Sequence, residues 1–224
     1  MPVLAATVYF NTKLAASASV AGTAGTAGYT DAHDAAAASF TPFGDINGQE
    51  LQGSAQYAIY RNGLFFNTST IPSDAAIISA TLSVYGVADS SLTDFNLTIV
   101  NGSALSNPYN ANDYGALLAA TASGGILSST AWSNTSYNEI PLNSIGLGFI
   151  TKAGTTKVAI RSSRDISSTR PTGFEWIEFL SVDETNPAKL TVSYEAKGNL
   201  FVKAERLHYV SYTGIEYYIQ GIAV

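Results

Sequence analysis

Hydrophobic and polar positions alternate most clearly near the middle of the chain. Between residues 78 and 85, Ile, Ala, Leu and Val occupy the even positions, and Ser, Thr, Ser and Tyr occupy the odd ones. This period of two predicts a strand with one buried face. An apolar run at 64–66 precedes it, and Pro72, Ser73 and Asp74 supply turn chemistry between the two. The stretch 60–85 is therefore expected to form strand, tight connection, strand.

Further strands are expected where the same pattern recurs, at 3–9, 92–100, 157–161, 175–181 and 187–195. About eight to ten short strands separated by turns are typical of a sandwich or jelly roll. We predict an all-β fold: a jelly-roll β-sandwich followed by a small C-terminal β-hairpin unit. Its expected core consists of Leu64, Phe66, Ile78, Leu82, Val84, Leu97, Ile99, Val158, Ile160, Leu190 and Val192.

Several stretches lack this alternation. Residues 15–28 are rich in Ala, Gly, Ser and Thr, which favours a flexible loop, and 45–53 are polar and turn-rich. A short helix is expected within 142–150, where neither period fits. Asp31, His33 and Asp34 are chemically able to bind a metal, but one His with two carboxylates is a weak ligand pattern. We interpret them as a solvated loop.

The C-terminal part is expected to be a second unit. A polar break at 196–199 divides the sandwich, 1–195, from an aromatic segment, 196–224. Within it, 200–210 and 215–219 flank a four-residue connection that ends in Gly214, which predicts a hairpin. A lone hairpin is marginal in water, so we expect it to be an assembly element with interface residues Phe201, His208, Tyr209, Tyr212, Tyr217 and Tyr218.

Composition narrows the function classes. Only 12% of the 224 residues are charged, so the surface is expected to be neutral and rich in hydroxyl groups, which suits extensive packing against other proteins. The net charge is −6 and the 11 basic residues form no run, which argues against nucleic acid. The absence of cysteine excludes disulfides and thiolate metal sites.

Targeting signals are also absent from the sequence. The first residues have no basic region followed by an apolar run, so no signal peptide is expected, and no stretch approaches the roughly 18 apolar residues of a membrane helix. We therefore expect a protein made in a cytoplasm, not exported by the general route and without membrane insertion. An extracellular location is the alternative.

Catalytic patterns are weak. Two carboxylate pairs occur, Glu175 with Glu178 and Asp183 with Glu184, but the first pair is expected on opposite faces of a strand and the second in a loop. No G-x-S-x-G motif and no phosphate loop are present. We expect no enzyme activity, no cofactor and no metal.

Three aromatic residues are candidates for glycan contact: Tyr109, Tyr114 and Trp132. Aromatic rings in solvent can stack on a sugar. The alternative for the two tyrosines is packing on the sandwich, which we favour.

Four segments together carry a family resemblance. They are YRNGLFFNTSTIPSDAAIISATLSVYG, AWSNTSYNEIPLN, KVAIRSSRDI and FLSVDETNPAKLTVSYE. Residues 57–194 resemble the DNRLRE-type jelly-roll domains, which are similar to carbohydrate-binding modules. The resemblance implies fold more than function. Asn67 stands where that family usually has Asp, so a structural cation implied by the family is in doubt. The C-terminal segment resembles short C-terminal segments of tailed-phage virion proteins.

Two functions follow as hypotheses. The first is a non-catalytic structural protein of a bacteriophage particle, such as a head decoration, fibre or tail subunit. It would contact other virion proteins, copies of itself and host-surface glycan. The second is a carbohydrate-binding module or adhesin domain of a cell-surface protein or filament.

Overall fold

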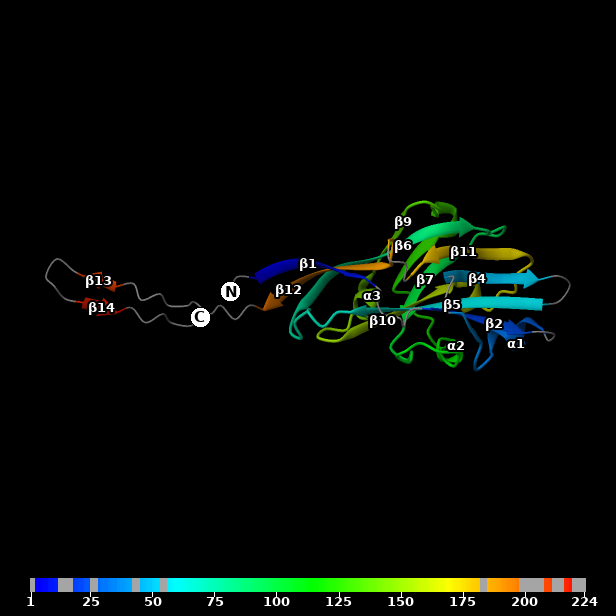
Figure 1. Cartoon of the computed structure of the whole chain (residues 1–224), viewed down its shortest axis with the longest axis horizontal. Coiled ribbons are helices and arrows are strands. Elements are labelled where there is room, and N and C mark those ends of the chain that lie inside the picture. The colour runs from blue at the N-terminus through cyan, green and yellow to red at the C-terminus, as the bar shows by residue number, and fades with distance from the viewer. Residues whose placement is uncertain are drawn as a thin grey trace.

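The computed structural model describes residues 3–11, 18–24, 28–41, 45–52, 56–181, 185–197, 208–210 and 216–218. It confirms the all-β fold (Figure 1). The strands are β1 (Val3–Asn11), β2 (Ala18–Ala24), β3 (Ser39–Thr41), β4 (Asp45–Gln52), β5 (Gln56–Asn67), β6 (Ala76–Asp89), β7 (Asn96–Asn101), β8 (Gly125–Ser128), β9 (Tyr137–Pro141), β10 (Thr155–Ser162), β11 (Phe174–Leu180), β12 (Lys189–Lys197), β13 (His208–Val210) and β14 (Glu216–Tyr218).

The described helices are short. They are α1 (Tyr29–His33), α2 (Asp113–Ala116), α3 (Ser144–Leu147), α4 (Ser163–Ile166) and the 3-10 turn η1 (Ser129–Ala131). The short helix expected within 142–150 is α3, and Asn143 caps it by accepting hydrogen bonds from the backbone of Ile145 and Gly146. In the part of the chain that is described, no helix is long and apolar enough to cross a membrane.

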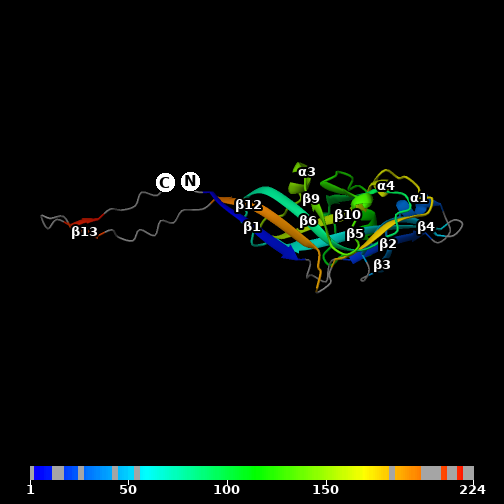
Figure 2. The same ribbon diagram turned by 90° about the horizontal axis from the view of Figure 1, so that it is seen from above.

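Twelve strands form one antiparallel sheet whose hydrogen-bonded order is β1-β12-β6-β11-β4-β5-β10-β7-β8. Two long strands organise it. Along one edge, β5 pairs first with β4 and then with β10, and along its other edge it pairs with β2. In the same way, β6 pairs along one edge first with β12 and then with β11, and along its other edge with β9. Because β4 and β11 join these two halves, the sheet bends over on itself and becomes nearly barrel-like (Figures 1 and 2).

The main core lies between the two halves of the sheet. Leu64 and Phe66 of β5 meet Leu82 and Val84 of β6 there, and all four are fully buried. Of the predicted core residues, ten are buried: Leu64, Phe66, Leu82, Val84, Leu97, Ile99, Val158, Ile160, Leu190 and Val192.

A second core covers the opposite face of β5, β10 and β7. It contains Phe65, Val100 and Ala159 from these strands, with Tyr29 from α1 and Tyr114 from α2 packed over them. In Figure 1, α1 and α2 lie on one side of β5, and β6 and β9 lie on the other. These strands are therefore buried on both faces, which is why nearly every residue of β5 is buried.

Ile78 is the exception among the predicted core residues, and its prediction was wrong: the side chain is 54% exposed. The cause is a β-bulge. Ser193 of β12 pairs with Ser79, but the next residue, Tyr194, pairs with Ile77, so one position of β6 is skipped. An extra residue in one strand reverses the alternation beyond it. Ile77 therefore packs against the core in place of Ile78.

Two segments predicted as loops or turns are strands. Residues 18–24, inside the predicted Ala/Gly-rich loop, form β2 and pair with β5, and 45–52 form β4 between β5 and β11. Both are weak strand formers by composition, so their pairing partners decide their conformation. Residues 15–17 and 25–27 of that loop lie outside the described residues.

The strands β13 and β14 pair antiparallel with each other, as the hairpin prediction requires, and form a separate two-stranded sheet (Figure 1). The turn expected between them lies outside the described residues. β12 continues to Lys197, which pairs with Val3 of β1. The strand thus extends two residues past the boundary predicted at 195.

Candidate functional site

The most unusual side chains of the second core are two buried arginines. β5 and β10 run antiparallel with Asn62 opposite Ile160, so the next residues along the two strands are Arg61 and Arg161. Both side chains are almost fully buried, at 0% and 1% exposure. Two like charges out of water carry a large desolvation cost unless a carboxylate and further hydrogen bonds compensate them.

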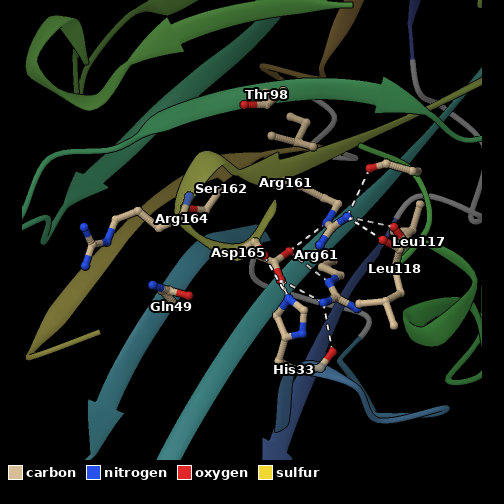
Figure 3. Close-up of polar contacts among 12 residues, drawn as sticks. His33, Gln49, Arg61, Thr98, Leu117, Leu118, Arg161, Ser162, Arg164 and Asp165 are labelled. Carbon is tan, nitrogen blue, oxygen red and sulfur yellow. Dashed lines mark hydrogen bonds and ion pairs between the residues drawn. The ribbon is translucent and has the colours of Figure 1, made fainter. Parts of the chain in front are cut away.

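Asp165 supplies that carboxylate from α4. Ser162 caps this helix, because its Oγ accepts from the backbone N–H of Arg164 at 3.1 Å, and the helix turns Asp165 back toward the sheet. Arg61 donates from Nε to Oδ2 at 2.9 Å and from Nη2 to Oδ1 at 2.7 Å. Arg161 donates from Nε to the same Oδ2 at 2.7 Å (Figure 3). One carboxylate thus bridges two neighbouring strands.

The remaining guanidinium N–H groups bond to backbone carbonyl oxygens of loops. Arg61 donates to the carbonyls of Tyr114 and His33, and Arg161 donates to those of Leu117, Leu118 and Ala120. Figure 3 labels three of these acceptors, His33, Leu117 and Leu118. The guanidinium of Arg61 also lies 4.1 Å from the ring centre of Tyr114. The cluster therefore fastens α1, α2 with the turn 117–120 that follows it, and α4 to the sheet.

Electrostatics within this cluster follow from burial and pairing. Burial alone raises the pKa of Asp165, but the hydrogen bonds and charges of Arg61 and then of Arg161 outweigh it and hold that pKa below its ordinary value. Burial likewise works to lower the pKa of Arg61, and its bonds to Asp165 reverse the effect and raise it. Both partners are ionised near neutral pH.

His33 lies at the edge of the cluster, and the solvated loop predicted for this segment was wrong. Residues 29–33 form α1, and His33 is buried, with 7% of its surface exposed. Its Nδ1 is 2.5 Å from Oδ1 of Asp34, and its Nε2 is 2.8 Å from the carbonyl oxygen of Asp165. Among the described residues, no group of three or more His, Cys, Asp or Glu side chains is placed to hold a metal ion.

Glu175 forms a second polar pair nearby. Its Oε2 accepts from Nε of Arg164 at 2.6 Å and from Nε2 of Gln49 at 3.0 Å. In Figure 3, Arg164 points away from Asp165. Glu175 is fully buried, and burial alternates along β11, which places it on the opposite face from Glu178 as predicted. The two carboxylates do not share a cleft.

The structure corrects the exposure assumed for two of the predicted glycan residues. Tyr109 and Tyr114 are 3% and 0% exposed and belong to the second core, so they pack on the sandwich, the alternative favoured for them. Burial raises the pKa of both phenols, first by desolvation. Trp132 is half-buried against the main core, and its buried Nε1 has no hydrogen-bond partner in the described part of the chain.

The predicted assembly residues are only partly described. His208 and Tyr209 are in β13, opposite Tyr218 and Tyr217 of β14 respectively, whereas Phe201 and Tyr212 lie outside the described residues. At the position where the resemblance implies Asp, Asn67 serves as a turn residue, and its Oδ1 accepts from the backbone N–H of Ser69 at 3.2 Å.

Sequence reasoning missed the cluster of Arg61, Arg161 and Asp165. The available signal was a charged residue inside an apolar strand: Arg61 follows the apolar run YAIY at 57–60, and Arg161 ends KVAIR. A strand buried on both faces leaves such a charge no route to solvent, so it must find a buried partner. Without the fold, however, the sequence does not show that β5 and β10 are covered on both sides.

The chain is therefore an all-β protein whose most tightly built polar site is a closed ionic cluster joining loops to a sheet. No family model matches the sequence, and no curated protein matches it.

Proposed function

We propose that this protein is a non-catalytic structural subunit of a bacteriophage particle, such as a head decoration, fibre or tail subunit, that acts through protein–protein packing. The carrying observation is the separate sheet of β13 and β14, which holds four of the six assembly residues named above. A two-stranded ribbon is marginal alone in water. Contact with a second copy or another virion protein supplies the burial that such a ribbon lacks.

The polar groups of the sandwich support a non-catalytic function. The buried carboxylates of Asp165 and Glu175 are occupied by arginines, and Glu178 is on the other face of its strand. Catalytic acids and bases need contact with substrate. A closed cluster of this kind serves rigidity, which suits a subunit packed in a symmetric array.

The test compares the full chain with a chain cut after Lys197, a position that leaves β12 and its pairing with β1 intact. We expect the shortened chain to keep its β-rich circular dichroism and its melting temperature, and to lose self-association in sedimentation velocity. Unchanged self-association would overturn the proposal. An unfolded shortened chain would also overturn it, because the C-terminal strands would then complete the monomer.

A matched pair of variants distinguishes the effect of the hairpin on self-association from the effect of chain length. Tyr209→Ser with Tyr217→Ser in the full chain changes one register pair of the ribbon. Tyr85→Ser with Tyr137→Ser changes a register pair of tyrosines in the sandwich. Only the first variant is expected to weaken association. The genes next to this one give an independent test: capsid and portal genes support the virion role, and glycosidase and secretion genes oppose it.

A carbohydrate-binding or adhesin role is the second candidate, and a group of aromatic rings favours it. Phe174 is 46% exposed and stands edge-to-face with Trp176, at 6.5 Å between ring centres. Trp176 donates to one oxygen of Glu50 and Tyr60 donates to the other. Glu50 is buried and holds these rings in a fixed orientation. Partly exposed rings fixed in this way suit stacking on a sugar.

Glycan-array binding of the full chain tests this second role. Phe174→Ala should remove binding, whereas Ile126→Ala, at a similarly exposed apolar residue of β8, should not. No binding to any glycan, or equal loss in both variants, would contradict it.

A further inference from the structure

The first strand of the sheet has one edge to which no strand of the described chain is paired. β1 lies at the end of the hydrogen-bonded order, and its residues pair with β12 from Val3 opposite Lys197 to Asn11 opposite Lys189. The register runs through all of these pairs without a bulge. The backbone N–H and C=O groups that point away from β12 therefore form a regular row, the β1 edge, that can hydrogen-bond another strand.

The β1 edge lacks the features that normally keep edge strands from pairing with other chains. Its sequence, VLAATVYFN, contains no charged residue and no proline. The other marginal strands of the described sheet are shorter: β3 has three residues, β8 four and β9 five, and β9 ends at Pro141. β1 is therefore the longest and least protected edge of this sheet.

The ribbon formed by β13 and β14 needs a further strand. Each of its strands has three residues, and neither is paired with any other strand of the described chain. A sheet of three or more strands, or packing against another element, is required for stability in water. The two strands, HYV and EYY, carry a single carboxylate and are rich in Tyr and Val, which favour strands. Addition to an uncharged edge strand supplies the strand that the ribbon lacks.

We propose that the ribbon of one copy adds to the β1 edge of a second copy. This contact rests on the proposed function and identifies the surface that receives the ribbon. Residues 198–207 separate the end of β12 from His208, and at about 3.3 Å per residue such a segment extends roughly 30 Å, far enough to reach a neighbouring subunit. Each copy gives one ribbon and receives one. A head-to-tail contact of this kind builds a ring or a filament, not a two-fold dimer.

Matched threonine substitutions in the full chain test this contact. The register places Thr7 of β1 and Thr191 of β12 on the same face of the sheet, opposite the face of Leu190 and Val192 in the main core. Thr7→Lys puts a charge on the β1 edge, whereas Thr191→Lys puts it on a strand that is paired on both sides. We expect both variants to keep their β-rich circular dichroism. In sedimentation velocity, Thr7→Lys should stay monomeric and Thr191→Lys should associate like the natural chain.

A mixing experiment tests the direction of the contact. The chain cut after Lys197 keeps the β1 edge and lacks the ribbon, and full-length Thr7→Lys keeps the ribbon and has a blocked edge. Neither should associate alone, and the two together should form a one-to-one complex. Ala5→Lys, whose register partner is Glu195, takes the place of Thr7→Lys if that variant does not fold.

The outcomes separate this contact from the proposed function. Self-association of the full-length edge variants, or no complex in the mixture, would mean that the ribbon binds elsewhere and would overturn the contact with β1. Self-association of the shortened chain would instead overturn the proposed function, because association would then not need the ribbon.

Discussion

Arg61 and Asp165 form a two-point contact, 2.9 Å from Nε to Oδ2 and 2.7 Å from Nη2 to Oδ1, although 104 residues separate them in sequence. Neither side chain has any exposed surface. A forked arginine–carboxylate pair fixes both partners in orientation as well as distance. It therefore sets where α4 sits on β5, and Arg161 donates to the same carboxylate from the neighbouring strand.

Asp165→Asn should be strongly destabilising. It removes the negative charge that Arg61 and Arg161 share, so both buried guanidinium groups lose their charged acceptor, and the NH2 group of the new amide is a donor facing donors. Breaking a buried pair by removing one partner costs about 3–5 kcal/mol. The free energy of unfolding, measured by urea denaturation at pH 7, should fall by that amount.

Asp74→Asn is the matched control for this measurement, because Asp74 is an exposed residue of the turn between β5 and β6. It should change the free energy of unfolding by no more than about 0.5 kcal/mol. Equal stability of the two variants would mean that the cluster adds nothing to the fold.

Acid should weaken the protein through Asp165. Its pKa is held below the ordinary value of about 3.9 in the folded state. A depressed pKa adds stability that is complete above the unfolded value and is lost as the pH falls through the folded one. The stability difference between the natural chain and Asp165→Asn should therefore be constant from about pH 7 to 5 and shrink below about pH 4. A difference independent of pH down to about 2 would contradict the ionised carboxylate.

Much of the fold could be predicted because period-two alternation reports directly on burial. Leu82 and Val84 were placed correctly in the core, because this part of the strand has one buried face and the apolar residues alternate onto it. β2 and β4 could not be predicted, because their small and polar residues become strands only through pairing with β5. The bulge at Ile78 was also hidden, because β12 determines where β6 skips a residue.

The candidate site was beyond sequence reasoning for a different reason. Arg61, Arg161 and Asp165 come from two strands and a helix, and only the antiparallel register of β5 and β10 brings the arginines together. Asp31, His33 and Asp34 were noticed, but as a weak metal-ligand pattern in a solvated loop. The contact between Nε2 of His33 and the carbonyl oxygen of Asp165 spans 132 residues, and the sequence alone does not show it.

The bulge predicts opposite behaviour for two adjacent isoleucines. Ile77→Ala should destabilise the protein by about 1–2 kcal/mol, because this side chain is partly buried against the main core. Ile78→Ala should change the free energy of unfolding by less than about 0.5 kcal/mol, because its side chain lies mostly in solvent. Urea denaturation of both variants measures the two losses of stability. A larger loss for Ile78→Ala than for Ile77→Ala would contradict the bulge and mean that the alternation continues unbroken through Ile78.

At Gly86, the addition of a single methyl group is expected to lower the stability of the fold. This residue of β6 lies under the loop 133–136, to which its backbone N–H donates through the carbonyl of Ser136 at 3.0 Å. A Cβ added at Gly86 would lie 1.9 Å from the carbonyl oxygen of Ser133 and 2.8 Å from Nδ2 of Asn138. Asn138 holds that loop in place by donating to the carbonyl of Ser133 at 2.9 Å and accepting from its N–H at 2.8 Å.

Gly86→Ala must therefore displace the loop or break its bonds to Asn138, and we expect a loss of about 1–3 kcal/mol, the usual cost of overpacking. Displacement of the loop should also alter the fluorescence of Trp132, which directly precedes it. Gly173→Ala is the control, since a Cβ there meets only Cδ1 of Leu92 at an ordinary 3.6 Å. If both variants unfold at the same urea concentration, the close approach between β6 and this loop is not required for stability.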